Sequence, residues 1–172
     1  RFVRDVVTTI DPADRRVTTA TGALDYDYLV LAMGAENHFF GVPGAEEFSF
    51  RFRTPDDAER IHARLVRLLE EDRKDIHLVL AGGGTEGVEV AGELLDLIKD
   101  SGSEYGPAGR TVAITLVEAQ QQLLPGFPRE ARAFAENCLR EQGVTIIAGQ
   151  RITAVRKDSL VLAAGTELPQ SM

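Results

Sequence analysis

A glycine-rich turn between an apolar run and an amphipathic stretch is the feature that most constrains how this chain folds. The run at 76–81 (IHLVLA) is short and apolar, and it leads directly into the glycines of 82–87 (GGGTEG). Residues 88–98 (VEVAGELLDLI) then repeat apolar side chains at helical spacing. This succession predicts a strand, a tight turn and a helix, which together begin a parallel β-α-β unit.

The segments that follow continue the alternation of strands and helices. Residues 111–117 are an apolar run that ends at Glu118, residues 128–142 have the pattern of a helix, and residues 144–148 are a third apolar run. Alternation of this kind predicts an α/β fold with a Rossmann-like parallel sheet and flanking helices. The stretch 101–109 (SGSEYGPAG) is expected to be a flexible, insertion-like loop.

Both ends of the chain predict antiparallel strands. Near the C-terminus, the runs at 151–156 and 159–163 are expected to pair as a hairpin. Near the N-terminus, the Val- and Thr-rich residues 2–10 and a β-rich run after an Asp-Pro turn predict another hairpin. That hairpin leads into the continuously apolar residues 28–32, which we expect to form a strand buried on both faces.

A helix is also expected at 55–73, ahead of the glycine-rich turn. Thr54 is a favourable N-cap, Pro55 suits the first helical position, and Asp57 completes a capping-box-like pair. One face of the stretch carries the apolar side chains of Ile61, Leu65, Leu68 and Leu69. The stretch therefore has the pattern of an amphipathic helix.

The composition excludes several function classes. The chain has 172 residues and a net charge of −8, from 19 Lys and Arg against 27 Asp and Glu, so nucleic acid is not an expected partner. No apolar run approaches the roughly 20 residues that span a bilayer. The single cysteine, Cys138, excludes an intramolecular disulfide or a cysteine-pair redox centre and fits a reducing compartment. The histidines, His38, His62 and His77, lack metal-site spacing, so no metal is expected.

Three of the four glycines of the turn follow the spacing Gly82-x-Gly84-x-x-Gly87. In a dinucleotide-binding turn the first glycine permits the tight exit from the strand, and the second lets the backbone approach a pyrophosphate. The third lets the helix pack closely on the strand. The N-terminus of the following helix would offer free N–H groups to the phosphates. We therefore predict that residues 82–87 bind the pyrophosphate of a dinucleotide, the alternative being a purely structural glycine turn.

Glu118, at the end of the next strand, is the candidate ligand of the adenosine ribose. A carboxylate there accepts hydrogen bonds from both ribose hydroxyls and repels a 2′-phosphate. Residues 119–123 contain no Lys or Arg to receive such a phosphate, so NAD is favoured over NADP. Glu118 lies farther from the glycines than the usual spacing of about 20 residues, and the loop at 101–109 absorbs the excess. The alternative is a solvated carboxylate at a strand end.

Three segments resemble one known family. GGGTEGVEVAGEL at 82–94 and VEAQQQLLPGFP at 117–128 resemble the NADH-binding domain of type II NADH dehydrogenases, in the FAD-dependent pyridine nucleotide–disulfide oxidoreductase superfamily. YDYLVLAMGAENHFFGVPG at 26–44 resembles the segment that leaves the family's FAD domain and enters its NADH domain. The resemblance implies an internal fragment of a flavoprotein with two Rossmann domains, which passes hydride from NADH to FAD and then reduces a quinone.

The resemblance also implies roles for single residues. The NADH pyrophosphate would lie against Gly82, Gly83, Gly84, Thr85, Glu86 and Gly87. Ala32, Met33 and Gly34 match the family's Ala-Thr-Gly strand end beside FAD, and Met33 departs from the usual small or hydroxylated residue. Glu89 matches a carboxylate near the nicotinamide and flavin, so it is the catalytic candidate and would orient the carboxamide. Its alternative is a first-turn helix acid favoured by the helix dipole.

The same resemblance divides the chain. Residues 1–40 would be a remnant of the FAD-binding domain, 41–53 a connector, and 54–172 an NADH-binding domain that is incomplete at its C-terminal end. A quinone or other electron acceptor would be reached through regions outside this chain, so the chain alone is expected to be inactive. The resemblance implies a cytoplasmic protein whose full length lies on the inner face of the cytoplasmic membrane.

Other functions stay open beside this one. A different FAD-dependent NAD(P)H reductase, of the ferredoxin-reductase type, would have the same build. A non-catalytic NAD-sensing module has no need of the β-rich segment at 1–34. A methyltransferase-like Rossmann fold also places an acid at the end of its second strand, but the stretch LLPGFP at 123–128 fits the flavoprotein better.

Overall fold

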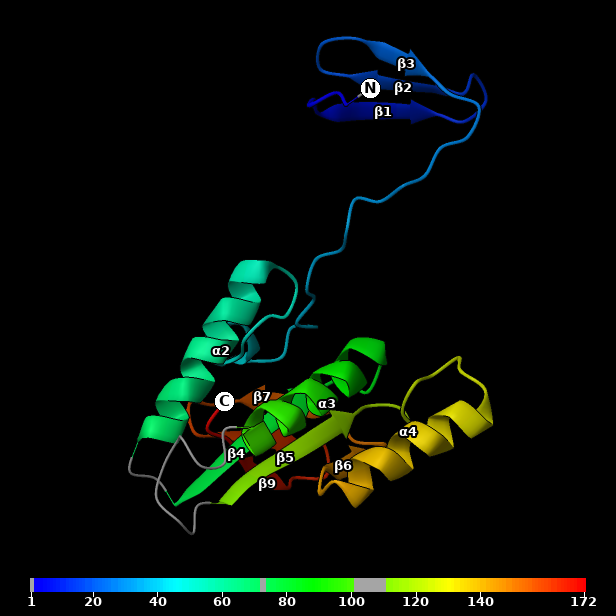
Figure 1. The fold of residues 1–172 in the computed structure, drawn as a ribbon. Coiled ribbons are helices and arrows are strands. Elements are labelled where there is room, and N and C mark those ends of the chain that lie inside the picture. Colours follow the sequence, from blue (N-terminus) through cyan, green and yellow to red (C-terminus); the bar gives the residue numbers. More distant parts are fainter. Residues whose placement is uncertain (1, 72–73, 101–110) are drawn as a thin grey trace. The chain divides into compact units, whose positions relative to one another are not determined.

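The computed structural model describes residues 2–71, 74–100 and 111–172 (Figure 1). The loop predicted at 101–109 therefore lies outside the described residues. The chain forms two compact units, Arg1–Glu36 and Asn37–Met172.

The N-terminal unit is a small antiparallel sheet, which confirms the predicted hairpin. Its three strands pair in the order β1-β2-β3. Their bounds are Val7–Asp11 for β1, Arg16–Thr19 for β2 and Ala23–Asp25 for β3. The turn between β1 and β2 is closed by Asp11, whose Oδ1 accepts from the amides of Ala13 at 2.9 Å and Asp14 at 3.1 Å. This local bond explains why an Asp-Pro sequence turns the chain here.

The prediction of a buried strand at 28–32 is wrong. These residues have no regular secondary structure, and Tyr28 is 93% exposed. A strand buried on both faces needs a hydrogen-bonding neighbour on each side and cover on each face. Within the described part of the chain no segment supplies either. The apolar pattern indicates that the segment prefers burial, but it does not supply a neighbouring strand for the segment to pair with.

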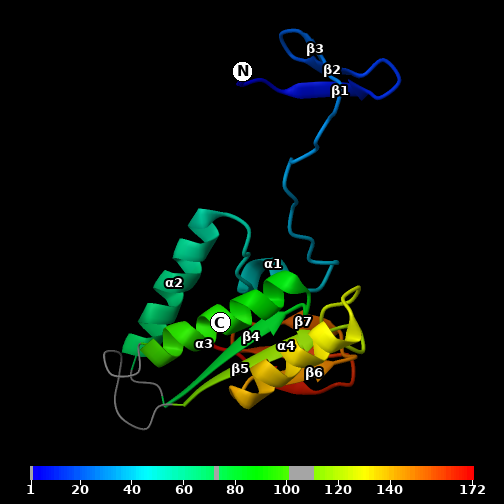
Figure 2. The ribbon, with the colours of Figure 1, turned by 45° about the vertical axis from the view of Figure 1, so that its right-hand side comes forward.

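The second unit is built on the predicted parallel sheet. Strands pair in the order β4-β5-β6, and helices α3 and α4 connect them. The elements are β4 Asp75–Ala81, α3 Thr85–Asp100, β5 Thr111–Glu118, α4 Arg129–Glu141 and β6 Thr145–Ala148. Both helices lie on the same face of this sheet (Figures 1 and 2). The α/β fold with a parallel sheet is therefore confirmed.

A second, antiparallel sheet covers the other face of the parallel one. Its strands are β7 Ile152–Val155, β8 Ser159–Leu162 and β9 Glu167–Pro169. Leu160 and Leu162 of β8 pack with Val117 of β5 in one apolar cluster. The hairpin at 151–156 and 159–163 is confirmed, and β9 is an addition to it. Three residues that include a proline are too weak a signal to predict a strand.

Helix α2, Pro55–Glu70, begins as the sequence predicts. The Thr54 hydroxyl accepts from the Asp57 amide at 3.2 Å, and the Asp57 carboxylate accepts from the Thr54 amide at 2.9 Å. These bonds to Thr54 also lower the pKa of Asp57. Leu65 and Leu68 are fully buried with the apolar side chains of α3 and the parallel sheet. The prediction of this helix is confirmed, although it ends at Glu70 rather than at residue 73.

The outer edge of β4 is paired by the last residues of the chain. Ser171 donates its amide to the His77 carbonyl at 2.7 Å, and Val79 donates its amide to the Met172 carbonyl at 3.0 Å. Backbone hydrogen-bonding groups on the outer edge of β4 are thus paired by residues far from β4 in sequence. Of the helices that the structure describes, none has the length and apolar character needed to cross a membrane.

Removing the cap of α2 should destabilise the second unit measurably. We expect Thr54→Ala to lower the free energy of unfolding by about 1 kcal/mol, because the Asp57 amide loses its acceptor. Thr166→Ala, at an exposed turn between β8 and β9, is the matched control and should change it by less than about 0.5 kcal/mol. Denaturant titration followed by circular dichroism measures both. Equal losses in the two variants would show that the cap contributes nothing.

Candidate functional site

The glycine turn lies at the carboxyl end of β4. Gly82 still pairs with the sheet, since its amide donates to the Val117 carbonyl at 2.8 Å. Its φ of +109° lies in a region that glycine adopts without strain. Helix α3 then begins at Thr85, three residues earlier than the sequence predicts. The second half of the glycine motif is therefore the first turn of the helix.

Gly83 and Gly87 are required by close packing. A Cβ on Gly87 would overlap the carbonyl oxygen of Gly82, so only glycine lets the helix start this close to the strand. A Cβ on Gly83 would overlap the side chain of Leu123, which packs over the turn. These two positions fit a structural turn as well as a binding turn.

Gly84 has a different environment. Nothing lies within 4 Å of the position that its Cβ would occupy, and its φ is not in the left-handed region. Neither backbone strain nor packing inside the protein therefore explains a glycine here. Open space above the backbone is what a ligand in close approach needs, so Gly84 fits a dinucleotide cradle.

The first backbone amides of α3 follow directly after Gly84 in the chain. Val88 donates to the Gly84 carbonyl at 3.1 Å and opens the helical series, so the amides of 84–87 precede it. Amides in the first turn of a helix have no carbonyl partner within the helix. Together with the positive end of the helix dipole, they form a favourable place for an anion.

Glu118 is directed at the glycine turn. It is the last residue of β5 and only 8% exposed. Its Oε2 accepts from the Gly83 amide at 2.6 Å, and its Oε1 accepts from the Gln120 amide at 2.6 Å. The alternative of a solvated carboxylate is therefore wrong. A carboxylate has about four acceptor sites, so two amides leave capacity for further donors.

The loop after β5 closes over the turn and holds this arrangement. Leu124 donates its amide to the Gly83 carbonyl at 2.7 Å, and both Leu123 and Leu124 are buried. Gly149, after β6, donates its amide to the Gln120 carbonyl at 2.8 Å. The ends of β4, β5 and β6 are thus joined into one rim, as expected for the ligand edge of an open α/β sheet.

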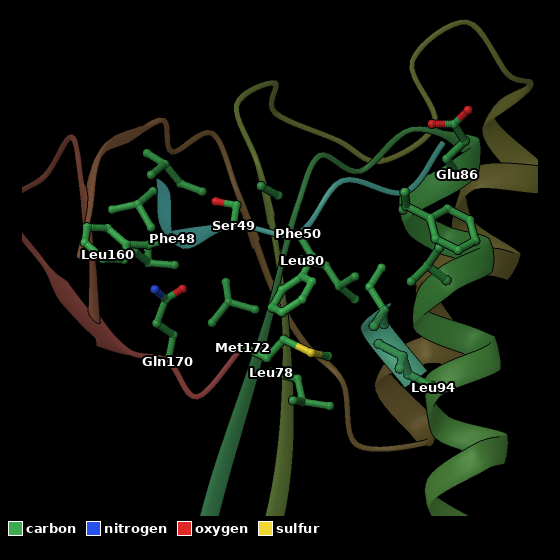
Figure 3. A pocket seen from close by; sticks show the side chains of 18 of the residues that line it. Phe48, Ser49, Phe50, Leu78, Leu80, Glu86, Leu94, Leu160, Gln170 and Met172 are labelled. Atoms are coloured by element: carbon green, nitrogen blue, oxygen red, sulfur yellow. The ribbon is translucent and has the colours of Figure 1, made fainter. Parts of the chain in front are cut away.

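A cavity of about 220 Å³ adjoins the turn on the side of the antiparallel sheet (Figure 3). Glu86 and Gly87 reach it from α3, and Gln170 reaches it from the residue after β9. Its apolar walls include Phe48, Phe50, Leu78, Leu80, Leu94 and Met172. Mostly apolar walls with a few polar groups are typical of a small-molecule site. The sequence does not reveal this cavity, because its walls come from segments far apart in the chain.

The other predicted site residues lie elsewhere. Glu89 is exposed on α3, one helical turn beyond Thr85. Ala32, Met33 and Gly34 belong to the N-terminal unit and are exposed there. The structure therefore brings together the residues of the turn and Glu118. The roles given to all of these residues stay predictions.

Comparisons with known proteins agree with the fold. A family model, pyridine nucleotide-disulphide oxidoreductase, matches residues 1–171. A type II NADH:quinone oxidoreductase from Staphylococcus saprophyticus is 32% identical over 98% of this chain and 44% of its own length. The external alternative NAD(P)H-ubiquinone oxidoreductase B2 of Arabidopsis thaliana mitochondria is 36% identical over 88% of this chain and 30% of its own length. The chain thus spans less than half the length of these relatives.

Solved structures share the fold. NDH2 from Plasmodium falciparum, in complex with NADH, has a TM-score of 0.76 at 23% identity, covering 99% of this chain and 39% of its own. A ferredoxin reductase from Rhodopseudomonas palustris has a TM-score of 0.66 at 24% identity, covering 97% and 38%. The family model and the 32% identical type II relative show that the methyltransferase-like alternative is wrong, and they confirm the resemblance carried by residues 82–94 and 117–128. Because the family model matches from residue 1 to residue 171, the chain belongs to the pyridine nucleotide-disulphide oxidoreductase family.

Proposed function

We propose that this chain binds NADH at the glycine turn, as the nucleotide-binding part of a flavin-dependent NADH dehydrogenase. The open space above Gly84, at the N-terminus of α3, is the observation that carries the proposal. The diphosphate would lie against the backbone of residues 82–87, and Glu118 would hold the adenosine ribose. The names of the relatives, which include type II NADH:quinone oxidoreductases, support NADH as the nucleotide.

In the longer protein we propose that hydride passes from NADH to FAD and then to a quinone. When bound, the nicotinamide and flavin supply the redox chemistry, and the protein binds and orients them. Glu89 would orient the nicotinamide carboxamide. Ala32, Met33 and Gly34 would lie beside FAD.

The proposed domain division follows from these roles. Residues 1–40 would contribute to an FAD-binding domain, 41–53 would connect, and 54–172 would bind NADH. The longer protein would lie in the cytoplasm, at the inner face of the cytoplasmic membrane, where its quinone is found. A reductase that delivers electrons to a ferredoxin is the second candidate, and the likeness to the ferredoxin reductase from Rhodopseudomonas palustris favours it.

The choice between NADH and NADPH tests Glu118. We expect the chain to bind NADH about tenfold more tightly than NADPH, a difference of about 1.4 kcal/mol, because the carboxylate repels a 2′-phosphate. Glu118→Arg should reverse the preference, and fluorescence titration of both nucleotides measures it. Glu141→Arg, an equal change of charge at the exposed end of α4, should leave the ratio unchanged. An unchanged ratio in a folded Glu118→Arg protein would remove the role given to Glu118.

The phosphate cradle is tested at Gly84. Gly84→Val should weaken NADH binding by more than about tenfold, because its side chain would fill the space left for the diphosphate. Gly92→Val is the matched control, since Gly92 lies within α3, away from the turn, and nothing is within 4 Å of its ideal Cβ either. Circular dichroism should show both variants folded. Wild-type affinity in Gly84→Val would mean that the turn is purely structural.

The electron acceptor is tested on the longer gene product. We expect it to carry a flavin that NADH bleaches and that a soluble quinone reoxidises within the same cuvette. Absorbance near the flavin maximum, followed after each addition, measures both steps. Reoxidation by a ferredoxin and not by the quinone would favour the second candidate. A colourless protein that still binds NADH would favour a sensing module.

A further inference from the structure

An ion pair lies beside the glycine turn and joins it to the connector. Nη1 of Arg53 is 2.6 Å from Oε1 of Glu86, across 33 residues of sequence. The Arg53 side chain is 34% exposed and that of Glu86 is 64% exposed. Arg53 carries no recognisable signal in the sequence, and Glu86 stands out there only as one of the residues between two glycines.

The position of Arg53 is fixed by the cap of α2. The Asp57 carboxylate accepts from the Arg53 amide at 3.2 Å and from the Thr54 amide at 2.9 Å. The neighbouring Phe52 lines the cavity that Glu86 also lines. Figure 3 shows Glu86 at the end of α3 that borders this cavity. The guanidinium therefore reaches Glu86 from a backbone that is already held in place.

Glu86 raises an electrostatic problem for an anion at this turn. It is the second residue of α3, where a carboxylate is stabilised by the positive end of the helix. The proposed diphosphate would use the same helix end and brings further negative charge. An unpaired carboxylate at the same helix end repels such a group, and partial exposure weakens this repulsion without removing it.

We propose that Arg53 is a positioning residue for the nucleotide: by neutralising Glu86 it lets the glycine turn accept a diphosphate. This inference rests on the proposed NADH site. It makes the connector part of nucleotide recognition rather than a passive link. Arg53 acts through Glu86, so its effect depends on that carboxylate being present.

A double-mutant cycle on the 172-residue chain tests this dependence. We expect Arg53→Gln to weaken NADH binding by about fivefold to tenfold, because Glu86 is left unpaired. Glu86→Gln removes the side-chain charge and keeps the backbone of the turn, and it is the second single variant of the cycle. The double variant, Arg53→Gln with Glu86→Gln, should bind like Glu86→Gln alone. Fluorescence titration at low ionic strength measures all four proteins, and added salt should shrink the effect of Arg53→Gln.

Two controls separate this role from a structural one. Arg51→Gln removes a similar ion pair from the same connector, since Arg51 lies 2.9 Å from Glu46, and it should leave NADH affinity unchanged. ADP-ribose carries the diphosphate and adenosine does not. The loss in Arg53→Gln should therefore appear with ADP-ribose and be absent with adenosine.

The outcomes distinguish this inference from the site on which it rests. If the wild-type chain binds NADH and Arg53→Gln binds within twofold of it, the role of Arg53 is overturned and the site stands. If the double variant is as weak as Arg53→Gln, Arg53 does not act by neutralising Glu86, and the inference is overturned. If the wild-type chain does not bind NADH, the proposed site and the inference both fail.

Discussion

The close approach of α3 to the end of β4 is the constraint on which the rest of the site depends. Gly87 lies so near the Gly82 carbonyl that no side chain fits between them. A bulkier residue at 87 would push the helix off the strand, and the amides of its first turn would move with it. The same approach places Gly83 against Glu118, where its amide is bonded. The absence of a Cβ at Gly87 thus fixes both the amides of the first turn of α3 and the position of Gly83 against Glu118.

The register of the parallel sheet then decides which residue of β5 meets the turn. Ala81 is paired with Val117, and the amide of Gly82 bonds the Val117 carbonyl. Glu118 is therefore level with the turn and not one residue before or after it. A shift by one residue would direct the neighbouring side chain there instead, because side chains alternate along a strand. The position of Glu118 is therefore set by the pairing of β5 with β4. The contact of α3 with β4 alone would not set it.

Local chemistry explains what the sequence predicts well. The capping box of α2, the glycine turn and the apolar runs of the parallel sheet each depend on residues within a few positions of one another. The wrongly predicted strand and the unpredicted pairing at the sheet edge are both non-local. Residues 28–32 have the composition of a buried strand but no partner, whereas 171–172 pair with the edge of β4 without any strand pattern. Periodicity indicates how a segment prefers to be buried, and only the fold decides what lies beside it.

The site shows the same division between local and non-local causes. Gly84 and Glu118 can be singled out from the sequence because each has a physical role at a defined position in a dinucleotide-binding motif. The ion pair of Arg53 with Glu86 joins the starts of two different helices, and no sequence pattern predicts it. Yet the ion pair has a local origin, because Asp57 holds the amide of Arg53 while it caps α2. Asp57, which stabilises the start of α2, therefore also helps to hold the Arg53 side chain beside the turn. In a chain with a net charge of −8, a single cation placed in this way offsets carboxylate charge beside the turn where the anion is proposed to bind.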